Sequence, residues 1–475
     1  MVDNLIGGTW SRPAGETLPV YRPATADVID EVPLSGADEV TTAVGAALEA
    51  YSSWAATSVV DRVTRMFNFK FLLEQHFEEL AALVTRHHGK TLDEARGEVR
   101  RGIEVVEFAC GAPTLLQGRT LRQATSEVDQ DLYRFPVGVV AGIPPFNFPV
   151  MIPLWMFPLA VVAGNTFVLK PSERTPLGAV RLAELFLEAG FPPGVLNIVH
   201  GAKSTAEALI SHPEVRAVSF VGSEAAARHV YEVAASHHKR VQALGGAKNH
   251  MVVTDDADLE RVVPAVLSSA FGNAGERCLA GSVAVAVGSV ASQLVAQLEE
   301  GARQLVVGPG DQPGVDLGPL IRAEHREWVV SCIERGVAEG ARLVVDGRPY
   351  AQRQGFFLGP TLLDDVAPTM AVAREEIFGP VLSVSRVANL DEAIDQVNAG
   401  TLGNMAVIFT KSGKTARTFR ERAEVGMVGV NVAVAQPFAF YPFSGWKSSF
   451  FGDLHVQGSD GIDFYTRKKM VVSRW

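Results

Sequence analysis

Cys278 lies in the stretch "FGNAGERCLAG", which spans residues 271–281 and consists largely of small residues. The chain has only three cysteines, and Arg277 directly precedes this one. A thiolate is a strong nucleophile, and a neighbouring guanidinium favours the thiolate over the thiol. The structural alternative is a buried cysteine that serves as a small apolar side chain. For Cys110 and Cys332, which have apolar, helix-like neighbours, we expect that structural role.

Composition limits the classes of protein to consider. The chain has 475 residues, 47% hydrophobic and 20% charged, which predicts a soluble globular protein of two or three domains. The net charge of −10 argues against nucleic acid or an anionic membrane as the main partner. Free cysteines and an N-terminus, "MVDNLIGGTW", without signal-peptide features favour a reducing, cytoplasmic location.

One apolar stretch, residues 148–169, resembles a membrane span in composition. Pro149, Pro153 and Pro158 interrupt it, and the apolar run stops at Gly164. Because a span needs roughly 20 uninterrupted apolar residues, we expect a buried helix that packs on a sheet.

Strands and helices alternate from about residue 134. Strands are expected in "RFPVGVVAGI", "TFVLKP", "GVLNIVHG", "AVSFVG" and "RVQALGG", and helices at 148–162, 176–189, 204–211 and 224–235. This pattern predicts a doubly wound, Rossmann-type α/β domain that binds ligands at the carboxyl ends of its strands. A second α/β set spans about 250–450. The stretches 115–135 and 461–475 alternate weakly and are expected to form a small sheet used in oligomerisation.

The dinucleotide signals are incomplete, since no GxGxxG follows a strand. However, Lys170 and Glu173 come just after one strand, where they could contact ribose hydroxyls. Ser223 opens a helix whose N-terminus could meet a pyrophosphate. The plain alternative is that the first two are solvated loop charges and the third is a helix cap.

A larger series of motifs carries a resemblance. It comprises "GIPPFNFP", "LKPSERTP", "SFVGS", "GGAKNH", "FGNAGERC", "EEIFGPVLSV" and "PFSGWKSSFFG". In this order the motifs resemble the aldehyde dehydrogenase superfamily, and within it the acyl-CoA-forming methylmalonate-semialdehyde dehydrogenases. The resemblance implies an NAD-binding domain (1–115 and 138–243), a catalytic α/β domain (244–455) and an oligomerisation flap (116–137 and 456–475) that builds dimers or tetramers.

The same resemblance implies roles for individual residues. Cys278 is the nucleophile, and the Asn147 amide and the Cys278 backbone N–H form the oxyanion hole. Glu173 would favour NAD over NADP, and no metal is expected. The implied cofactor-binding residues are Pro144, Phe146, Lys170, Glu173, Arg174, Ser223, Gly245, Glu376 and Phe378.

One motif departs from the hydrolytic members of the superfamily. They carry Glu-Leu-Gly-Gly-Lys where this chain has "LGGAK", so Leu244 replaces the glutamate that activates water. Without that base, the acyl-enzyme should survive until a thiol such as coenzyme A attacks it. The alternative is that another carboxylate supplies the base.

Two arginines are candidates for binding a carboxylate on the substrate. A guanidinium can hold a carboxylate bidentately, and Arg277 beside the nucleophile is well placed for this. Arg101, which we expect near the start of a helix, matches the subgroup's second carboxylate-binding position. An internal ion pair is the alternative for Arg277, and neighbouring Arg100 is the alternative for Arg101.

Together these features predict NAD-dependent oxidation of methylmalonate or malonate semialdehyde, followed by decarboxylation and acyl transfer to coenzyme A. The products would be propionyl-CoA or acetyl-CoA, with a place in valine or inositol catabolism. Two alternatives stay open. One is a hydrolytic, NAD(P)-dependent enzyme for another acidic semialdehyde such as succinate semialdehyde. The other is a non-catalytic protein of this fold.

Overall fold

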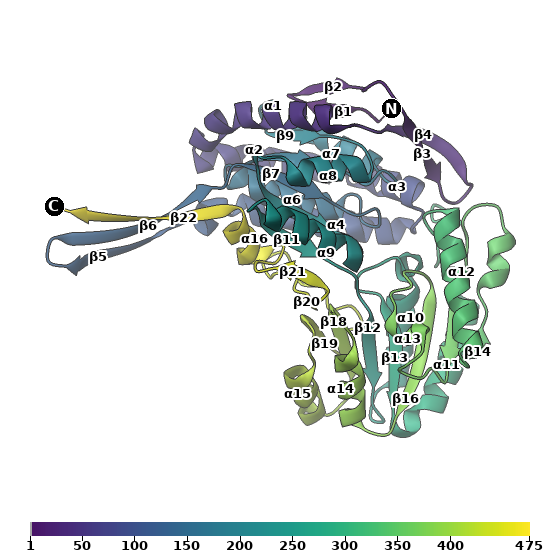
Figure 1. The fold of residues 1–475 in the computed structure, drawn as a ribbon. Coiled ribbons are helices and arrows are strands. Elements are labelled where there is room, and N and C mark those ends of the chain that lie inside the picture. The colour runs from purple at the N-terminus through teal and green to yellow at the C-terminus, as the bar shows by residue number, and fades with distance from the viewer. Residues whose placement is uncertain (1) are drawn as a thin grey trace.

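Two large sheets and a smaller third sheet organise the molecule, which we describe from a computed structural model over residues 2–475. One lobe surrounds an eight-stranded sheet, and a second lobe surrounds a seven-stranded sheet (Figure 1). The third sheet projects from the first lobe as a long arm, and the C-terminus lies at its tip (Figure 1).

The first sheet has the doubly wound order that the sequence predicts. Its five central strands are parallel and lie in the order β9-β8-β7-β10-β11, so the direction of winding reverses at β7. Such a reversal leaves a crevice at the carboxyl ends of the strands. In spatial order the strands are β2 (Thr9–Ser11), β1 (Asn4–Ile6), β9 (Leu196–Ile198), β8 (Thr166–Leu169), β7 (Val139–Ile143), β10 (Val215–Val221), β11 (Arg240–Leu244) and β21 (Phe450–Gly452).

Helices cover both faces of this sheet because its strands are apolar on both sides. On one face α1 (Ala37–Ala56), α8 (Lys203–Ser211) and α9 (Glu224–Ser236) enclose one core with alternate residues of β7. On the other face lie α2 (Val59–Gln75), α4 (Leu92–Cys110), α6 (Met151–Val162) and α7 (Leu177–Glu188). The four helices predicted from 148 to 235 are therefore present, with bounds shifted by up to three residues.

The apolar stretch that resembles a membrane span forms β8 and α6. All twelve residues of α6 are buried, and Gly102 of α4 approaches Leu154 of this helix closely. The expectation of a buried helix on a sheet is confirmed. Within residues 2–475 the structure contains no helix with the length and apolarity that crossing a membrane requires.

The second sheet is parallel except for its first strand. In spatial order its strands are β14 (Arg342–Val345), β15 (Thr361–Asp364), β16 (Val381–Val387), β13 (Gly281–Val287), β12 (Asn249–Val253), β18 (Met405–Phe409) and β19 (Met427–Val430). The helix α10 (Leu259–Phe271) leads into the loop that carries Cys278, and β13 follows that loop. From the C-terminal region, β21 returns to pair with β11 of the first sheet.

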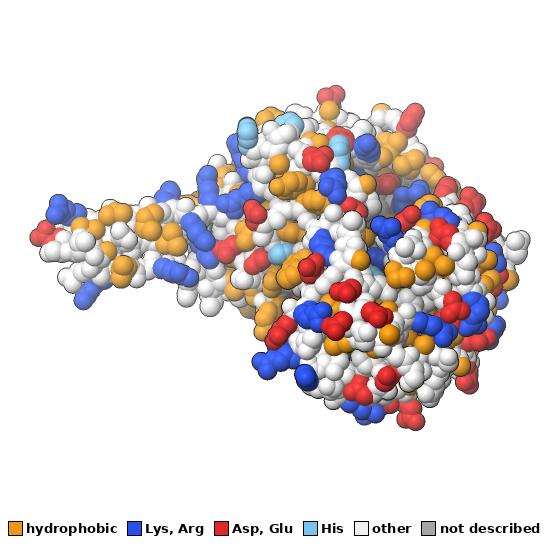
Figure 2. Space-filling view, turned by 60° about the horizontal axis from the view of Figure 1, so that its bottom comes forward, with side chains coloured by type: hydrophobic (Ala, Val, Ile, Leu, Met, Phe, Trp, Pro, Cys, Tyr) orange, Lys and Arg blue, Asp and Glu red, His pale blue; other side chains and the backbone are white. Residues whose placement is uncertain are grey.

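The arm is built from the two stretches that the sequence marks as weakly alternating. Its antiparallel strands lie in the order β22 (Thr466–Arg474), β6 (Val128–Pro136) and β5 (Arg119–Thr125), and α16 (Gly458–Phe464) precedes β22. Hydrophobic side chains lie exposed along it among basic ones (Figure 2). Tyr133, Met470 and Val472 are among the exposed apolar residues. The predicted small sheet is confirmed.

Candidate active site

The predicted cofactor residues gather at the carboxyl ends of the parallel strands. Phe146 follows β7, Lys170 and Glu173 follow β8, Ser223 follows β10, and Gly245 follows β11. Since β7 and β10 flank the point where the winding reverses, these residues lie where a doubly wound sheet has its ligand crevice. Pro144, directly after β7, is buried at the same edge.

Lys170 and Glu173 form an ion pair at the end of β8. The Lys170 Nζ lies 3.0 Å from Glu173 Oε2, and Lys170 is 4% exposed. Burial alone would raise the pKa of Glu173, but the charge of Lys170 and hydrogen bonds from Lys170 and the backbone outweigh it and lower that pKa. Glu173 is therefore an ionised acceptor, which suits ribose hydroxyls and repels a phosphate.

Phe146 and two further predicted residues, Phe378 and Arg174, form a cluster that we call the wall of the crevice. The Phe146 ring meets the Phe378 ring edge-on at 5.9 Å, and the Arg174 guanidinium lies 5.3 Å from the centre of the Phe146 ring. Phe378 has φ +60°, a left-handed conformation that is costly for a residue with a side chain. Its backbone carbonyl accepts a hydrogen bond from His325 Nε2 at 2.7 Å.

Glu376 lies against the segment that follows β11. Its Oε1 accepts a hydrogen bond from the Ala247 backbone N–H at 2.9 Å, and a Cβ on Gly246 would lie 2.6 Å from its Oε2. Burial raises the pKa of Glu376 to about 7. Gly245 is needed for another close approach, since a Cβ there would lie 2.7 Å from the Ser448 carbonyl oxygen. Ser223 caps α9 by accepting a hydrogen bond from the Ala226 N–H.

The loop before Cys278 has an unusual backbone. Asn273, Ala274 and Gly275 all have positive φ, at 56°, 52° and 73°. Only glycine tolerates this region without strain, and at Gly275 a Cβ would also lie 2.1 Å from the Gly379 carbonyl oxygen. Glu94 stabilises the turn by accepting the Asn273 N–H at 2.6 Å. The loop is therefore held in a shape that its own sequence does not favour.

Asn147 is hydrogen-bonded directly to this loop. Its Nδ2 donates to the Glu276 carbonyl at 2.9 Å, two residues before the nucleophile. The Asn147 backbone carbonyl accepts from Lys90 Nζ at 2.7 Å, and Lys90 forms a fully buried ion pair with Glu98 at 2.6 Å. Because Nδ2 has two hydrogens, one remains for a substrate oxygen.

Cys278 is half-buried, and two asparagines fix its backbone. Its carbonyl accepts from Asn249 Nδ2 at 2.8 Å and from Asn404 Nδ2 at 2.9 Å. Burial, with a smaller contribution from the charge of Glu376, raises the pKa of the thiol to about 12. Arg277 and the backbone N–H groups of Cys278 and Leu279 oppose this rise without cancelling it. The neighbouring arginine therefore does not by itself produce a thiolate here.

The two predicted carboxylate-binding arginines have different surroundings. Arg277 donates through Nη2 to the Ser268 and Ser269 carbonyls at 2.9 and 3.0 Å, at the end of α10. Its Nε is buried and, among residues 2–475, has no hydrogen-bond partner. Helix carbonyls thus take the place of the internal ion pair that was the alternative to substrate binding, and the Nε donor has no partner among residues 2–475.

Arg101 lies in the middle of α4, so the expectation that it lies near a helix start is wrong. Its Nη1 bonds Glu104 at 2.8 Å, and its guanidinium lies 4.6 Å from the centre of the exposed Phe438 ring. Arg100 is bonded to both carboxylate oxygens of Glu74 at 2.8 and 2.9 Å. Arg101 therefore remains the better candidate of the two.

Leu244 ends β11 and is 4% exposed. Its side chain packs in the apolar core, and its carbonyl accepts from the Gly222 N–H at 3.1 Å. A water held against this leucine would find no base in the side chain.

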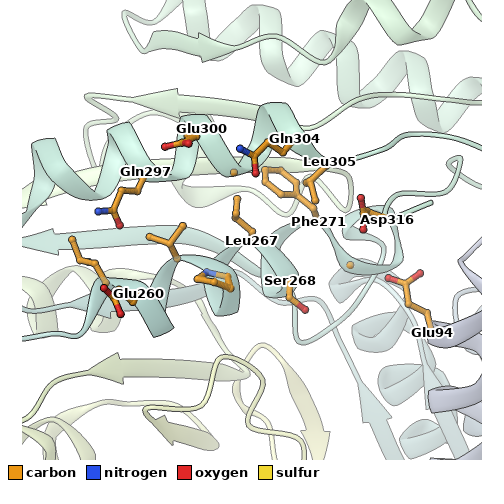
Figure 3. A pocket seen from close by; sticks show the side chains of 15 residues that line it. Glu94, Glu260, Leu267, Ser268, Phe271, Gln297, Glu300, Gln304, Leu305 and Asp316 are labelled. Carbon is orange, nitrogen blue, oxygen red and sulfur yellow. The ribbon is translucent and has the colours of Figure 1, made fainter. Parts of the chain in front are cut away.

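A cavity lies beside the loop that carries Cys278. It has a volume of about 810 Å³ and lies between α10 and α11 (Ala291–Gln304), with Glu94 at one end (Figure 3). Its polar lining is mainly acidic and includes Glu260, Glu300 and Asp316. None of the predicted catalytic or cofactor residues lies among the residues that line it. An anionic substrate would be repelled there.

A second, much smaller cavity is lined by residues from three of the predicted motifs. Its volume is about 20 Å³, enough for roughly one water, and it lies among residues of "GGAKNH", "FGNAGERC" and "EEIFGPV". Ala247, Arg277, Glu376 and Phe378 are part of its lining. Segments that are far apart in the sequence thus meet around one point.

The sequence did not reveal several residues that position the site. Asn249 is the last letter but one of "GGAKNH", yet nothing in the motif showed that it holds the Cys278 carbonyl. Apart from residue type, nothing in the sequence indicated that the site depends on Lys90, Glu98 and His325. Glu276 stands two residues before the nucleophile, and only the fold shows that it is completely buried.

Comparison with known proteins identifies the family and the fold. The profile of the aldehyde dehydrogenase family matches residues 10–471. The chain belongs to the aldehyde dehydrogenase family. It is 54% identical to malonate-semialdehyde dehydrogenase 1 of Geobacillus kaustophilus, with 100% of this chain and 98% of that protein aligned. It is 52% identical to malonate-semialdehyde dehydrogenase of Halalkalibacterium halodurans, over 99% of this chain and 98% of that protein.

Solved structures agree with the family assignment. The methylmalonate-semialdehyde dehydrogenase of Oceanimonas doudoroffii has a TM-score of 0.98 and 47% identity, covering 100% of this chain and 98% of its own. A Sinorhizobium meliloti protein assigned to the methylmalonate-semialdehyde dehydrogenases, crystallised with NAD, has a TM-score of 0.98 and 44% identity, covering 99% and 97%. The aldehyde dehydrogenase fold expected from the motifs is confirmed.

The raised thiol pKa predicts how this aldehyde dehydrogenase reacts with an alkylating agent. Without cofactor, Cys278 should react slowly with iodoacetamide at neutral pH, and the rate should rise about tenfold per pH unit up to pH ~10, because only the thiolate reacts. Cys110 and Cys332, at 8% and 1% exposure, should react more slowly still. Peptide mass spectrometry gives the three rates. A rate that levels off near pH 9, as for an ordinary thiol, would show that the thiol pKa is not raised.

Proposed function

We propose that this protein is an NAD-dependent, CoA-acylating dehydrogenase of malonate semialdehyde or methylmalonate semialdehyde. The observation that carries the proposal is Leu244, buried at the end of β11 where hydrolytic relatives have a catalytic glutamate. The relatives and solved structures described above, named for these two substrates, support the same reading.

The residues at the strand ends suit NAD. Glu173 is ionised and can accept from both ribose hydroxyls, and Lys170 can donate to one of them. Glu376 would take the nicotinamide ribose, while Phe146, Phe378, Pro144 and Arg174 line the cleft. Ser223 and Gly245 complete it at the start of α9 and after β11. When bound, NAD supplies the acceptor for the hydride that leaves the substrate.

The chemistry of the chain's own residues begins with Cys278. Its sulfur adds to the aldehyde carbon as the thiol proton passes to water, and the carbonyl oxygen becomes an alkoxide. The free Asn147 Nδ2 hydrogen and the Cys278 backbone N–H stabilise that charge. After oxidation the acyl group remains on Cys278 as a thioester, and its β-carboxylate can leave as CO2. The electrons of the broken bond then form an enolate, which the same donors stabilise.

The last step depends on the nucleophile that cleaves the thioester. Water attacks a thioester poorly unless a base removes its proton, and Leu244 cannot do so. Coenzyme A has a thiol that ionises near neutral pH and needs less help. Once the enolate has taken up a proton from solvent, the coenzyme A thiol attacks the thioester and the Cys278 sulfur leaves, which gives acetyl-CoA or propionyl-CoA. Glu376 is one candidate for a substitute base, and the hydrogen bond from the Ala247 N–H engages one of its oxygens.

Recognition of an acidic substrate is assigned to Arg277 and Arg101. The buried, unpartnered Nε of Arg277 is a donor that a carboxylate could satisfy. Arg101, half-buried against Phe438, would contact the substrate from α4. The arm, with its exposed apolar side chains, would build a homodimer or homotetramer. The domain boundaries, a cytoplasmic location, and a place in valine or inositol catabolism remain predictions.

The loss of the base predicts how coenzyme A affects turnover. Without it, the wild type should release a burst of one NADH per active site and then turn over slowly. Adding coenzyme A should raise the steady rate at least about tenfold, because thiol attack replaces unassisted hydrolysis. Leu244→Glu should gain hydrolysis, and Leu244→Gln is its uncharged control. If coenzyme A changes neither rate nor product, the hydrolytic alternative replaces this function.

The arginine predicts a difference between substrates. Arg277→Leu should lose roughly tenfold to a hundredfold in kcat/KM on malonate semialdehyde, since a desolvated charged hydrogen bond contributes about 1.5–3 kcal/mol. On propionaldehyde, which has no carboxylate, the loss should be much smaller. Arg417→Leu, at an exposed site on α15 (Gly413–Arg422), is the control. An equal loss on both substrates would mean that Arg277 supports only the loop.

A further inference from the structure

A buried acid with no role in the chemistry above lies two residues before the nucleophile. Glu276 is 0% exposed, and its backbone carbonyl holds Asn147. Among residues 2–475 its side chain has a single hydrogen bond, in which Oε1 accepts from the Ile321 N–H at 3.2 Å. Its Oε2 is buried and has no hydrogen-bond partner among residues 2–475. An ionised carboxylate in this position would have too few hydrogen bonds to offset its loss of hydration.

Two imidazoles face the acid from separate helices. The Nε2 of His88, at the end of α3 (Phe77–His88), lies 3.8 Å from Oε2. The Nε2 of His325, on α12 (Ala323–Ala338), lies 3.6 Å from Oε1. Neither distance is a hydrogen bond. Burial lowers the pKa of both histidines, so both are neutral around the acid.

The nearby cations are largely engaged elsewhere. Lys90 is neutralised by Glu98 at 2.6 Å, and Arg174 lies 4.0 Å from Glu173. Arg322 faces His325 and Arg174, and its closest carboxylate is that of Glu324 at 3.7 Å. Burial therefore dominates and raises the pKa of Glu276 to about 8, with only partial opposition from the Ile321 N–H, Arg174 and Lys90. The acid holds its proton at neutral pH.

His325 has one proton and two possible acceptors for it. Its Nε2 donates to the Phe378 carbonyl at 2.7 Å, and the same nitrogen lies 3.6 Å from Glu276 Oε1. Phe378 depends on that bond, since its φ of +60° is strained and its ring forms the wall of the crevice with Phe146. His325 is therefore placed between the nucleophile loop and the wall of the nicotinamide site.

We propose that Glu276 is a positioning residue that must hold its proton for NAD to bind tightly, because its carboxylate competes with the Phe378 carbonyl for the Nε2 proton of His325. The inference rests on the proposed NAD site. The neutral acid is a weaker and more distant acceptor than the Phe378 carbonyl, so His325 keeps its hydrogen bond to that carbonyl.

Ionisation reverses the competition. A carboxylate accepts a hydrogen bond about twice as strongly as a neutral carbonyl, and a shift of a few tenths of an ångström would bring Nε2 within bonding distance. The Phe378 carbonyl then loses the hydrogen bond from His325. Without this bond, Phe378 is no longer held in its left-handed conformation. The crevice wall would relax away from the geometry that binds the cofactor.

The test is the dissociation constant for NAD, measured by titration calorimetry at about pH 7 and about pH 9. If only the protonated form binds, the wild-type constant should rise about tenfold, since about a tenth of the molecules keep the proton one unit above the pKa. Glu276→Gln is neutral at every pH and should bind equally well at both. Glu299→Gln, at a half-exposed site on α11, should behave like the wild type.

His325→Phe tests the same proton without altering the acid. It removes the donor, so NAD should bind more weakly than in the wild type at pH 7 and should weaken no further at pH 9. A wild-type constant that does not change with pH, or a Glu276→Gln constant that rises as much as that of the wild type, would overturn the inference. Failure of the wild type to bind NAD at pH 7 would instead refute the proposed cofactor site.

Discussion

The carbonyl oxygen of Glu276 accepts hydrogen bonds from two asparagine side chains that come from different parts of the fold. Asn147, after β7 of the first sheet, donates at 2.9 Å, and Asn273, within the left-handed loop, donates at 2.7 Å. The loop has positive φ at three successive residues and would not keep this shape alone. The shared acceptor therefore fixes the loop and places the oxyanion donor beside the nucleophile in one arrangement.

The same arrangement explains why the site is buried but still reactive. The thiol of Cys278 loses acidity through burial, so the protein cannot rely on a preformed thiolate. It provides donors for the oxygen that becomes charged in the proposed reaction. Leu244, buried at the end of β11, offers no base to a water molecule, whereas a thiol brings its own acidity. The proposed preference for coenzyme A over water depends on this leucine.

Sequence patterns predicted the doubly wound sheet because each strand and helix between 134 and 244 has its own period and its own turn residues. The ordered motifs then singled out Cys278, Asn147, Lys170 and Glu376 as site residues, and their roles remain predictions. Tertiary contacts decided the rest. Arg277 lies against the end of α10, Arg101 lies mid-helix beside Phe438, and β21 joins the first sheet. Glu276 is buried by α3, α12 and two loops together. A local sequence pattern cannot predict burial of this kind.

We expect the acyl group to remain on Cys278, because no base activates a water molecule to hydrolyse the thioester. The most direct measurement is the mass of the enzyme after brief incubation with NAD and propionaldehyde without coenzyme A. We expect the mass of the enzyme to increase by one propionyl group on the peptide that contains Cys278. Adding coenzyme A should remove this group. An unmodified Cys278 under conditions that produce NADH, or an adduct that hydrolyses as fast as coenzyme A removes it, would contradict the account.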